Sequence, residues 1–201
     1  MKVFRYFLLS LFLLLLSVPA LYSYNILYAE QYYRLYHDQL HRYPEDTLEN
    51  IYYLERALHA DFCNPLNALA VIENKQEWRR YRHLFRVHVN VKLVELYLTL
   101  GSKYDKMNAY FYNYPWRAEN LKSLDKAERI YKMALYYWDE AIKWSKRIPP
   151  SYINLEEIQN WEDENYRIQT GELDYRDIIN SHLDRLREVR RAFEEMDEST
   201  Y

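Results

Sequence analysis

The chain has 201 residues, of which 49% are hydrophobic and 28% are charged, and its formal net charge is −3. This length and balance fit one globular domain with a buried core and exclude a disordered chain. Two glycines are too few for the Gly-rich loops that bind nucleotide phosphates, whereas 23 tyrosines supply buried area with hydroxyl groups that need hydrogen-bond partners.

The first domain, residues 1–27, is predicted to be a membrane anchor or signal segment. Lys2 and Arg5 precede an uncharged stretch at residues 6–29. As a helix this stretch is about 36 Å long, enough to cross a hydrocarbon core of ~30 Å. The positive end stays in the cytoplasm, so we expect a single pass through the inner membrane with the rest of the chain in the periplasm. The small residues of "SVPA" also permit cleavage, which would give an exported periplasmic protein.

The second domain, residues 28–198, is predicted to consist of helices joined by short turns. Apolar residues at helical spacing predict six helices, over about 28–43, 48–58, 77–100, 115–145, 153–169 and 174–196. Gly171 is expected to end the fifth helix in a left-handed conformation, and Asp174 to cap the sixth. The expected fold class is therefore all-α, with about three antiparallel helical hairpins.

Small and bulky residues alternate along one stripe of the helix that contains residues 123–145. Alanines recur every seventh position, and a bulky residue stands three positions before each of them: Leu124 and Ala127, Tyr131 and Ala134, Trp138 and Ala141. Small residues at this spacing let a neighbouring helix approach closely. The stripe predicts a packing seam, and the breaks around it favour an array of helical repeats over a coiled coil.

Three stretches resemble tetratricopeptide repeats. "NIYYLERALHADFCNP" is similar to the second helix of a repeat and "LGSKY" to the start of a first helix, and Ala127, Tyr131 and Ala134 match the spacing of another second helix. The resemblance covers most of residues 28–196 and implies a short solenoid of stacked hairpins. The whole chain is also similar to the helical-repeat proteins that build the periplasmic flagellar collar of spirochaetes, which implies a scaffold in an envelope assembly.

No motif predicts catalysis, a cofactor or a metal site. His37 and His41 have the spacing of half a zinc site, but the same helix face holds Glu30 and Arg34, which favours a solvated face. The carboxylates between residues 156 and 164 lack the context of a catalytic pair, and no serine lies in a nucleophile motif. Cys63 is expected to be a small buried residue. We therefore expect a protein that is not an enzyme.

Two stretches are candidate partner-binding surfaces. "WRRYRHLFR" (78–86) places Arg79, Arg82 and Arg86 on one stripe, and "YFYNYPW" (110–116) contains Tyr112, Tyr114 and Trp116. The negative net charge and the export signal argue against nucleic acid, so the arginines form a solvated face or bind an acidic partner. The aromatic residues either fill the core between helices or contact a partner.

The leading functional prediction is a membrane-anchored periplasmic scaffold that binds proteins. Helical-repeat folds present extended surfaces, and no residue pattern in the chain indicates chemistry. The alternative is a periplasmic helical module that binds a small molecule or a peptide in a tyrosine-lined groove. A deep enclosed cavity would favour a ligand, and an open aromatic surface would favour a protein partner.

Overall fold

The computed structural model describes residues 25–107, 111–148 and 155–200, and all its regular elements there are helical. The α-helices are α2 (Ala29–Arg42), α3 (Thr47–His59), α4 (Lys75–Ser102), α5 (Arg117–Ser145), α6 (Gln159–Thr170) and α7 (Tyr175–Glu194). Three short 3₁₀ turns are η1 (Pro65–Asn67), η2 (Tyr114–Trp116) and η3 (Glu156–Ile158). The predicted all-α class is confirmed.

The predicted anchor lies almost entirely outside the described residues, which begin at residue 25. Residues 25–27 are not helical, and α2 starts at Ala29. Within the described part of the chain, no helix combines the length and the apolar composition needed to cross a membrane.

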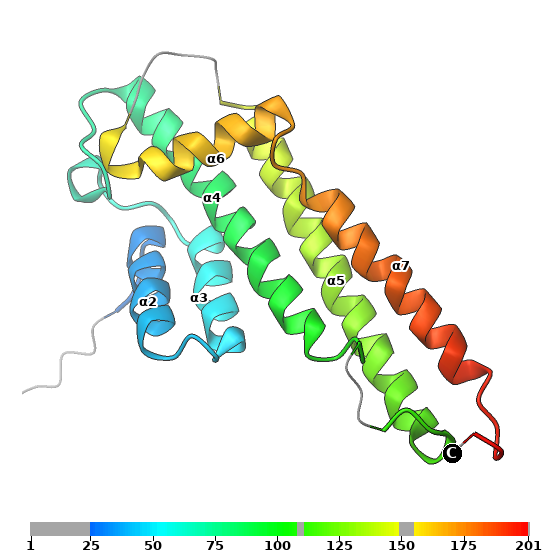
Figure 1. Cartoon of the computed structure of the whole chain (residues 1–201). Coiled ribbons are helices and arrows are strands. Elements are labelled where there is room, and N and C mark those ends of the chain that lie inside the picture. Colours follow the sequence, from blue (N-terminus) through cyan, green and yellow to red (C-terminus); the bar gives the residue numbers. More distant parts are fainter. Residues whose placement is uncertain (1–24, 108–110, 149–154, 201) are drawn as a thin grey trace, which may run out of the picture.

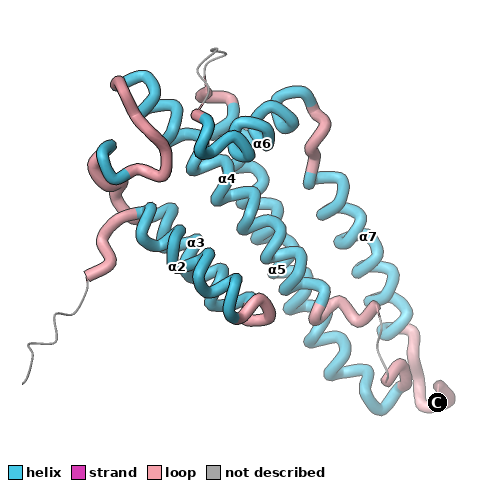
Figure 2. Tube along the Cα trace, turned by 60° about the vertical axis from the view of Figure 1, so that its left-hand side comes forward, coloured by secondary structure: helices cyan, strands magenta, loops and turns pink. Residues whose placement is uncertain are grey.

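Five helices lie side by side in the order α2, α3, α4, α5, α7, and α6 crosses one end of this row (Figure 1). The long helices α4 and α5 run antiparallel in the middle. The α2/α3 hairpin lies on one side of them and α7 on the other (Figure 2). Two of the three predicted hairpins, α2/α3 and α4/α5, are therefore present.

The predicted third hairpin is wrong, because α6 and α7 do not pack along each other (Figure 1). Gly171 ends α6 with a φ of 80°, and the Asp174 side chain accepts a hydrogen bond from the Arg176 backbone N–H, both as predicted. The two helices nevertheless have different neighbours. The buried residues of α6 are Trp161, Glu162 and Asn165, which contact α4 and α5, while α7 buries Ile179, Leu186 and Phe193.

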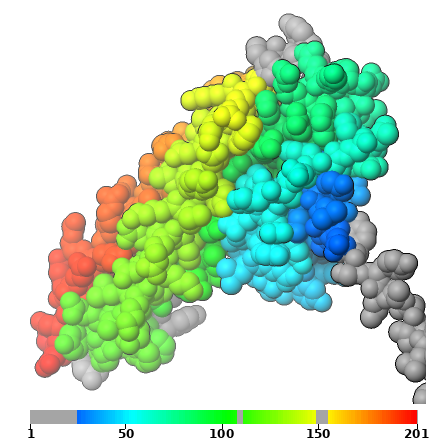
Figure 3. All heavy atoms as spheres, turned by 180° about the vertical axis from the view of Figure 1, so that it is seen from behind, coloured from blue at the N-terminus to red at the C-terminus, as the bar shows by residue number. Residues whose placement is uncertain are grey.

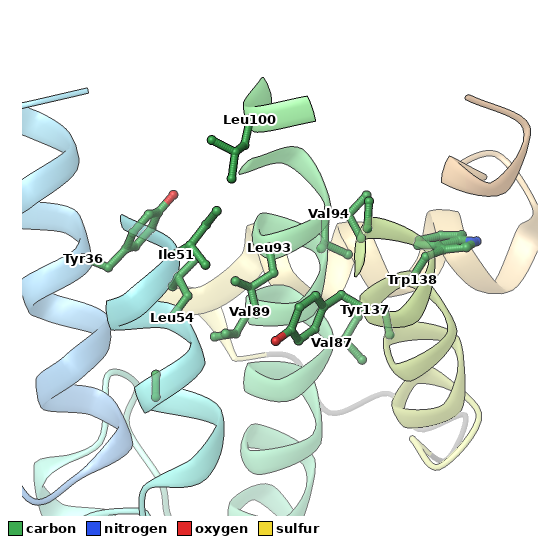
Figure 4. Close-up of a cluster of buried hydrophobic side chains, with 14 of the residues drawn as sticks. Tyr36, Ile51, Leu54, Val87, Val89, Leu93, Val94, Leu100, Tyr137 and Trp138 are labelled. Carbon is green, nitrogen blue, oxygen red and sulfur yellow. The ribbon is translucent and has the colours of Figure 1, made fainter. Parts of the chain in front are cut away.

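The hydrophobic core runs between the helices of the row. Ile51 and Leu54 of α3 lie beside Val89 and Leu93 of α4, and Val87 and Val94 lie on the side of α4 toward α5, from which Tyr137 points to α4 and Trp138 points away from it (Figure 4). The second half of α4 therefore touches neighbours on two sides, as its apolar sequence predicts.

The seam predicted in α5 is buried. Ala127, Ala134 and Ala141 each have an exposed fraction of 0%, and the bulky row is buried with them. Its members contact α7 in antiparallel register: the Tyr131 ring stacks on His182 at 4.9 Å, and the Trp138 ring meets Tyr175 edge-on at 5.5 Å. Residues 131 and 138 are seven apart, as are residues 175 and 182, so α5 and α7 pack as two straight neighbouring stripes.

Four tyrosine hydroxyls donate hydrogen bonds to carboxylates between the packed helices. Tyr97 and Tyr137 both donate to one oxygen of Glu55, each at 2.7 Å, and so join α3, α4 and α5. Tyr131 donates to Asp105 at 2.8 Å and Tyr175 donates to Glu95 at 2.8 Å. Burial raises the pKa of all four phenols, so they stay protonated and act as donors.

Candidate functional site

The first half of α4 carries the predicted arginine stripe, but its members differ in exposure. Arg79 is exposed, whereas Arg82 and Arg86 are half-buried. The stripe is therefore only partly exposed, because aromatic side chains cover part of it. Arg80, which the stripe did not include, turns inward and forms a bidentate ion pair with Glu162 of α6.

Two of these arginines belong to a cluster that we call the arginine–tryptophan cluster: Arg82, Arg86, Arg147 and Trp144. The Arg86 guanidinium lies 4.5 Å from the Trp144 ring centre, and the Arg147 guanidinium lies 4.3 Å from it. Arg86 also lies 4.9 Å from the Phe62 ring, and Arg82 lies 5.5 Å from the Trp78 ring. Such stacking holds the arginine side chains in place.

Burial and mutual repulsion disfavour the charged forms of Arg86 and of the neighbouring His83. Burial lowers the pKa of Arg86, and the positive charges of Arg82 and Arg147 lower it further. Burial also lowers the pKa of His83, whose ring lies 5.5 Å from Trp144, and Arg86 repels its charged form. In the described part of the chain, no carboxylate forms an ion pair with Arg82, Arg86 or Arg147, although ion pairs engage other arginines.

The second predicted surface lies at the start of α5. Phe111, Tyr112 and Trp116 have exposed fractions of 56%, 45% and 45%, and we call them the aromatic cluster. The Phe111 and Trp116 rings lie 4.8 Å apart, and the Tyr112 ring contacts Phe193 of α7 at 4.4 Å. Tyr114 is half-buried, and its backbone N–H donates to the Thr200 carbonyl at 3.1 Å. Of the two alternatives, an exposed surface fits these rings better than a core plug.

The structure does not bring the two predicted surfaces together. The arginine–tryptophan cluster uses the first half of α4 and the end of α5, whereas the aromatic cluster lies at the opposite end of the α4/α5 hairpin (Figure 3). Because α5 alone has 29 residues, it separates the two surfaces by about 40 Å.

A buried polar network on α4 was missed by sequence reasoning. The Tyr33 hydroxyl lies 2.8 Å from Nε2 of His88, whose Nδ1 lies 2.6 Å from a carboxylate oxygen of Glu164. The His88 ring stacks on Trp161 at 5.0 Å. His88 is 2% exposed and Tyr33 is 7% exposed, so this hydroxyl–imidazole–carboxylate relay joins α2, α4 and α6 inside the core. Its members are far apart in the chain, and no local pattern marks them.

A half-open pocket of about 430 Å³ lies beside the start of α2. Glu30, Arg34 and Cys63 line it, together with Tyr28 and residues 66–68. The buried Glu30 carboxylate accepts hydrogen bonds from the Cys63 backbone N–H at 3.0 Å and from the Tyr81 hydroxyl at 3.3 Å. Burial and the Glu30 charge raise the pKa of the Cys63 thiol to about 12, which keeps it protonated.

The histidine and carboxylate leads are dispersed in the structure. His37 and His41 are both exposed on α2. Glu162 pairs with Arg80, Glu164 bonds His88, and Asp163 is exposed. No group of three or more metal-ligating side chains occurs among the residues that the structure describes.

Residues 76–196 match DUF8513, which is described as a domain of unknown function. The chain belongs to this family. The match spans α4 through α7 and so includes both predicted surfaces, whereas α2 and α3 precede it. Neither a curated protein nor a solved structure matches the chain.

Proposed function

We propose that this DUF8513 protein is a membrane-tethered helical scaffold that binds another protein outside the cytoplasm. The observation that carries the proposal is the aromatic cluster, Phe111, Tyr112 and Trp116, because each of these large side chains is about half exposed. Single exposed apolar residues are common on protein surfaces, but adjacent aromatic residues are typical of protein interfaces.

The tether and the location rest on the sequence. Residues 1–27 act as an anchor or a signal segment, and residues 28–198 form the periplasmic domain. The order of α2 to α5, in which each helix packs on the next, supports a short tetratricopeptide-like stack, with α6 and α7 as its modified end. The resemblance to spirochaete collar proteins supports an envelope assembly, such as the flagellar motor, as the place where the scaffold works.

Photo-crosslinking in living cells tests the proposal. A photoreactive amino acid replaces Trp116 in the full chain, and a control variant carries it at Tyr52, which is exposed on α3. We expect a discrete protein adduct from position 116 and none from position 52. If both positions give the same adducts, or if neither gives one, the aromatic cluster is not a partner-binding surface.

A second candidate function is the binding of a small molecule or a peptide, and the pocket beside Glu30 and Arg34 favours it. Its volume of about 430 Å³ is large enough for a small ligand. Replacing Ala68, which lines the pocket, with tryptophan would fill it. A metabolite mixture that raises the melting temperature of the parent but not of Ala68→Trp would support this second function, and equal shifts would count against it.

A further inference from the structure

The arginine–tryptophan cluster carries positive charge that no carboxylate of the described residues neutralises by an ion pair. Arginines of α7, by contrast, form ion pairs with carboxylates: Arg185 pairs with Asp105 at 2.6 Å, and Arg190 pairs with Asp125 at 2.6 Å. The chain has 30 acidic residues, so carboxylates are not scarce, and residues 149–154, which follow the cluster in the sequence, include none. The guanidinium groups of Arg86 and Arg147 thus stack on the Trp144 indole, the Arg82 charge lies near enough to repel that of Arg86, and none of the three has an internal counter-ion among the described residues.

The donors of these groups are available to a ligand. A guanidinium that stacks on an aromatic ring uses its flat face, and its N–H groups remain in the plane of the fork. One N–H group of Arg86 donates a weak hydrogen bond of 3.4 Å to the Arg82 carbonyl. Nε of Arg82 is buried and has no hydrogen-bond partner within the described structure.

We propose that Arg82, Arg86 and Arg147 form a binding site for the carboxylate groups of an acidic peptide segment. This inference rests on the proposed function, because the segment belongs to the scaffold's protein partner. Planar carboxylates match the guanidinium fork, and charge-assisted bonds of this kind are about twice as strong as neutral ones. Trp144 stacks against Arg86 and Arg147 and so holds two of the three guanidinium groups in place.

The size of the site favours a peptide over nucleic acid. Nucleic acid needs an extended basic surface, whereas this chain has a net charge of −3 and Arg82, Arg86 and Arg147 lie together at one end of the α4/α5 hairpin. Arg79 is exposed one helical turn before Arg82, so it extends the same positive surface along α4.

The test measures binding of a labelled oligoglutamate peptide to the full-length protein in detergent, by fluorescence anisotropy at low salt. The variant Arg82→Gln, Arg86→Gln, Arg147→Gln removes three charges and keeps side chains that still pack on the rings. Each lost charge-assisted bond is worth about tenfold in affinity, so we expect a loss of at least ~100-fold. The matched control removes three other exposed arginines: Arg42→Gln, Arg129→Gln and Arg191→Gln.

The proposal requires that the control variant binds nearly as the parent does and that oligoglutamine does not bind. An equal loss in both variants would show attraction by net charge alone and would overturn the site. Inorganic phosphate or vesicles of anionic lipid that displace the peptide at much lower concentration than free glutamate peptide would assign the site to another anion. The crosslink from position 116 is independent of this assay, so failure of the scaffold function and failure of this site are distinguishable.

Discussion

At the scale of single residues, the smallest side chains determine how closely α4 and α5 approach. Gly101 lies in the last turn of α4, and a Cβ atom built there would lie 2.3 Å from the Tyr131 ring. The ring is fully buried and its hydroxyl is bonded to Asp105, so it has no room to move away. Glycine is required at this position by the close approach of a neighbouring side chain.

We therefore predict that Gly101→Ala destabilises the protein. In a free helix this change would be stabilising by about 1 kcal/mol, because alanine has the higher helix propensity. Here overpacking against Tyr131 costs about 1–3 kcal/mol and reverses the sign. Thermal unfolding followed by circular dichroism measures the effect, with Ser102→Ala, at the exposed next position, as control. A melting temperature that rises in Gly101→Ala would show that the ring yields.

The alanine row gives a second prediction at this scale. Ala134 is fully buried, so Ala134→Leu adds volume to the seam and is expected to cost about 1–3 kcal/mol. Lys132→Leu changes a residue of the same helix that is exposed and pairs with Glu128 one turn away. Surface pairs of this kind contribute little, so this control should unfold near the parent's temperature. Equal melting temperatures for the two variants would place the seam elsewhere.

At the scale of elements, α6 is held by buried polar contacts together with Trp161, whose ring lies 5.6 Å from Phe85 and 5.0 Å from His88 of α4. Its buried face carries Glu162 and Asn165 beside Trp161. Glu162 pairs with Arg80 of α4, and the Ser145 hydroxyl of α5 donates to Asn165 at 2.7 Å. The attachment of this helix therefore depends on charges and amides that have left water.

Glu162→Gln should loosen α6 while the rest of the row keeps its structure. Both partners of the ion pair are 8% exposed, and removing one leaves the Arg80 charge buried without its counter-ion. Breaking such a pair costs about 3–5 kcal/mol. Hydrogen exchange resolved by peptide should show faster exchange in α6 and unchanged exchange in α3. Asp139→Asn, which breaks the exposed pair with Arg176, should leave α6 unchanged, and comparable exchange in the two variants would contradict the prediction.

The same polar face explains which elements could be predicted from the sequence. The helices α2 to α5 were predicted with their approximate ends because their apolar stripes repeat at helical spacing. The predicted helix over about 153–169 ends within one residue of α6, but α6 starts only at Gln159, and its direction was not predicted. Glu162 and Asn165 have the composition of a solvated face, and their buried partners on α4 and α5 are distant in the chain. Sequence periodicity predicted the helix but not the neighbours on which it packs.

The candidate site also has a part that could be predicted from the sequence and a part that could not. Arg82 and Arg86 were predicted because they share a helix face, and the aromatic cluster because its residues are adjacent in the sequence. Arg147 and Trp144 were not predicted as site residues, because only the antiparallel packing of α4 on α5 brings them beside Arg86. Local sequence patterns therefore identified site residues that lie on one helix, and they missed residues that only the packing of two helices brings together.

At the scale of the whole molecule, the start of α2 determines where the domain lies relative to the membrane. The Ala29 backbone N–H donates a hydrogen bond to the Asp61 carbonyl at 2.8 Å, so the chain is bound to the folded domain from residue 29 onward. If residues 1–27 form the anchor, no long linker separates it from α2. The start of α2 and the pocket beside Glu30 would then lie near the bilayer surface, with the aromatic cluster at the far end of the row (Figure 1).

We predict that the mature protein keeps its N-terminal segment and remains membrane-bound. The reason is the uncharged stretch before the described domain, residues 6–24, which as a helix would reach about 28 Å and so match a ~30 Å hydrocarbon core, whereas a cleavable signal needs a shorter apolar stretch. Alkaline carbonate extraction should leave the protein in the membrane pellet, and N-terminal sequencing should begin at the start of the chain. Introducing Lys at Leu13 and Leu15, in the middle of the stretch, should release the protein from the pellet or block its export, because charged residues are costly at the bilayer centre. A mature protein that begins near Leu21 and fractionates with soluble periplasmic proteins would instead identify a cleaved signal, and the scaffold would then depend on its partners alone for its place at the membrane.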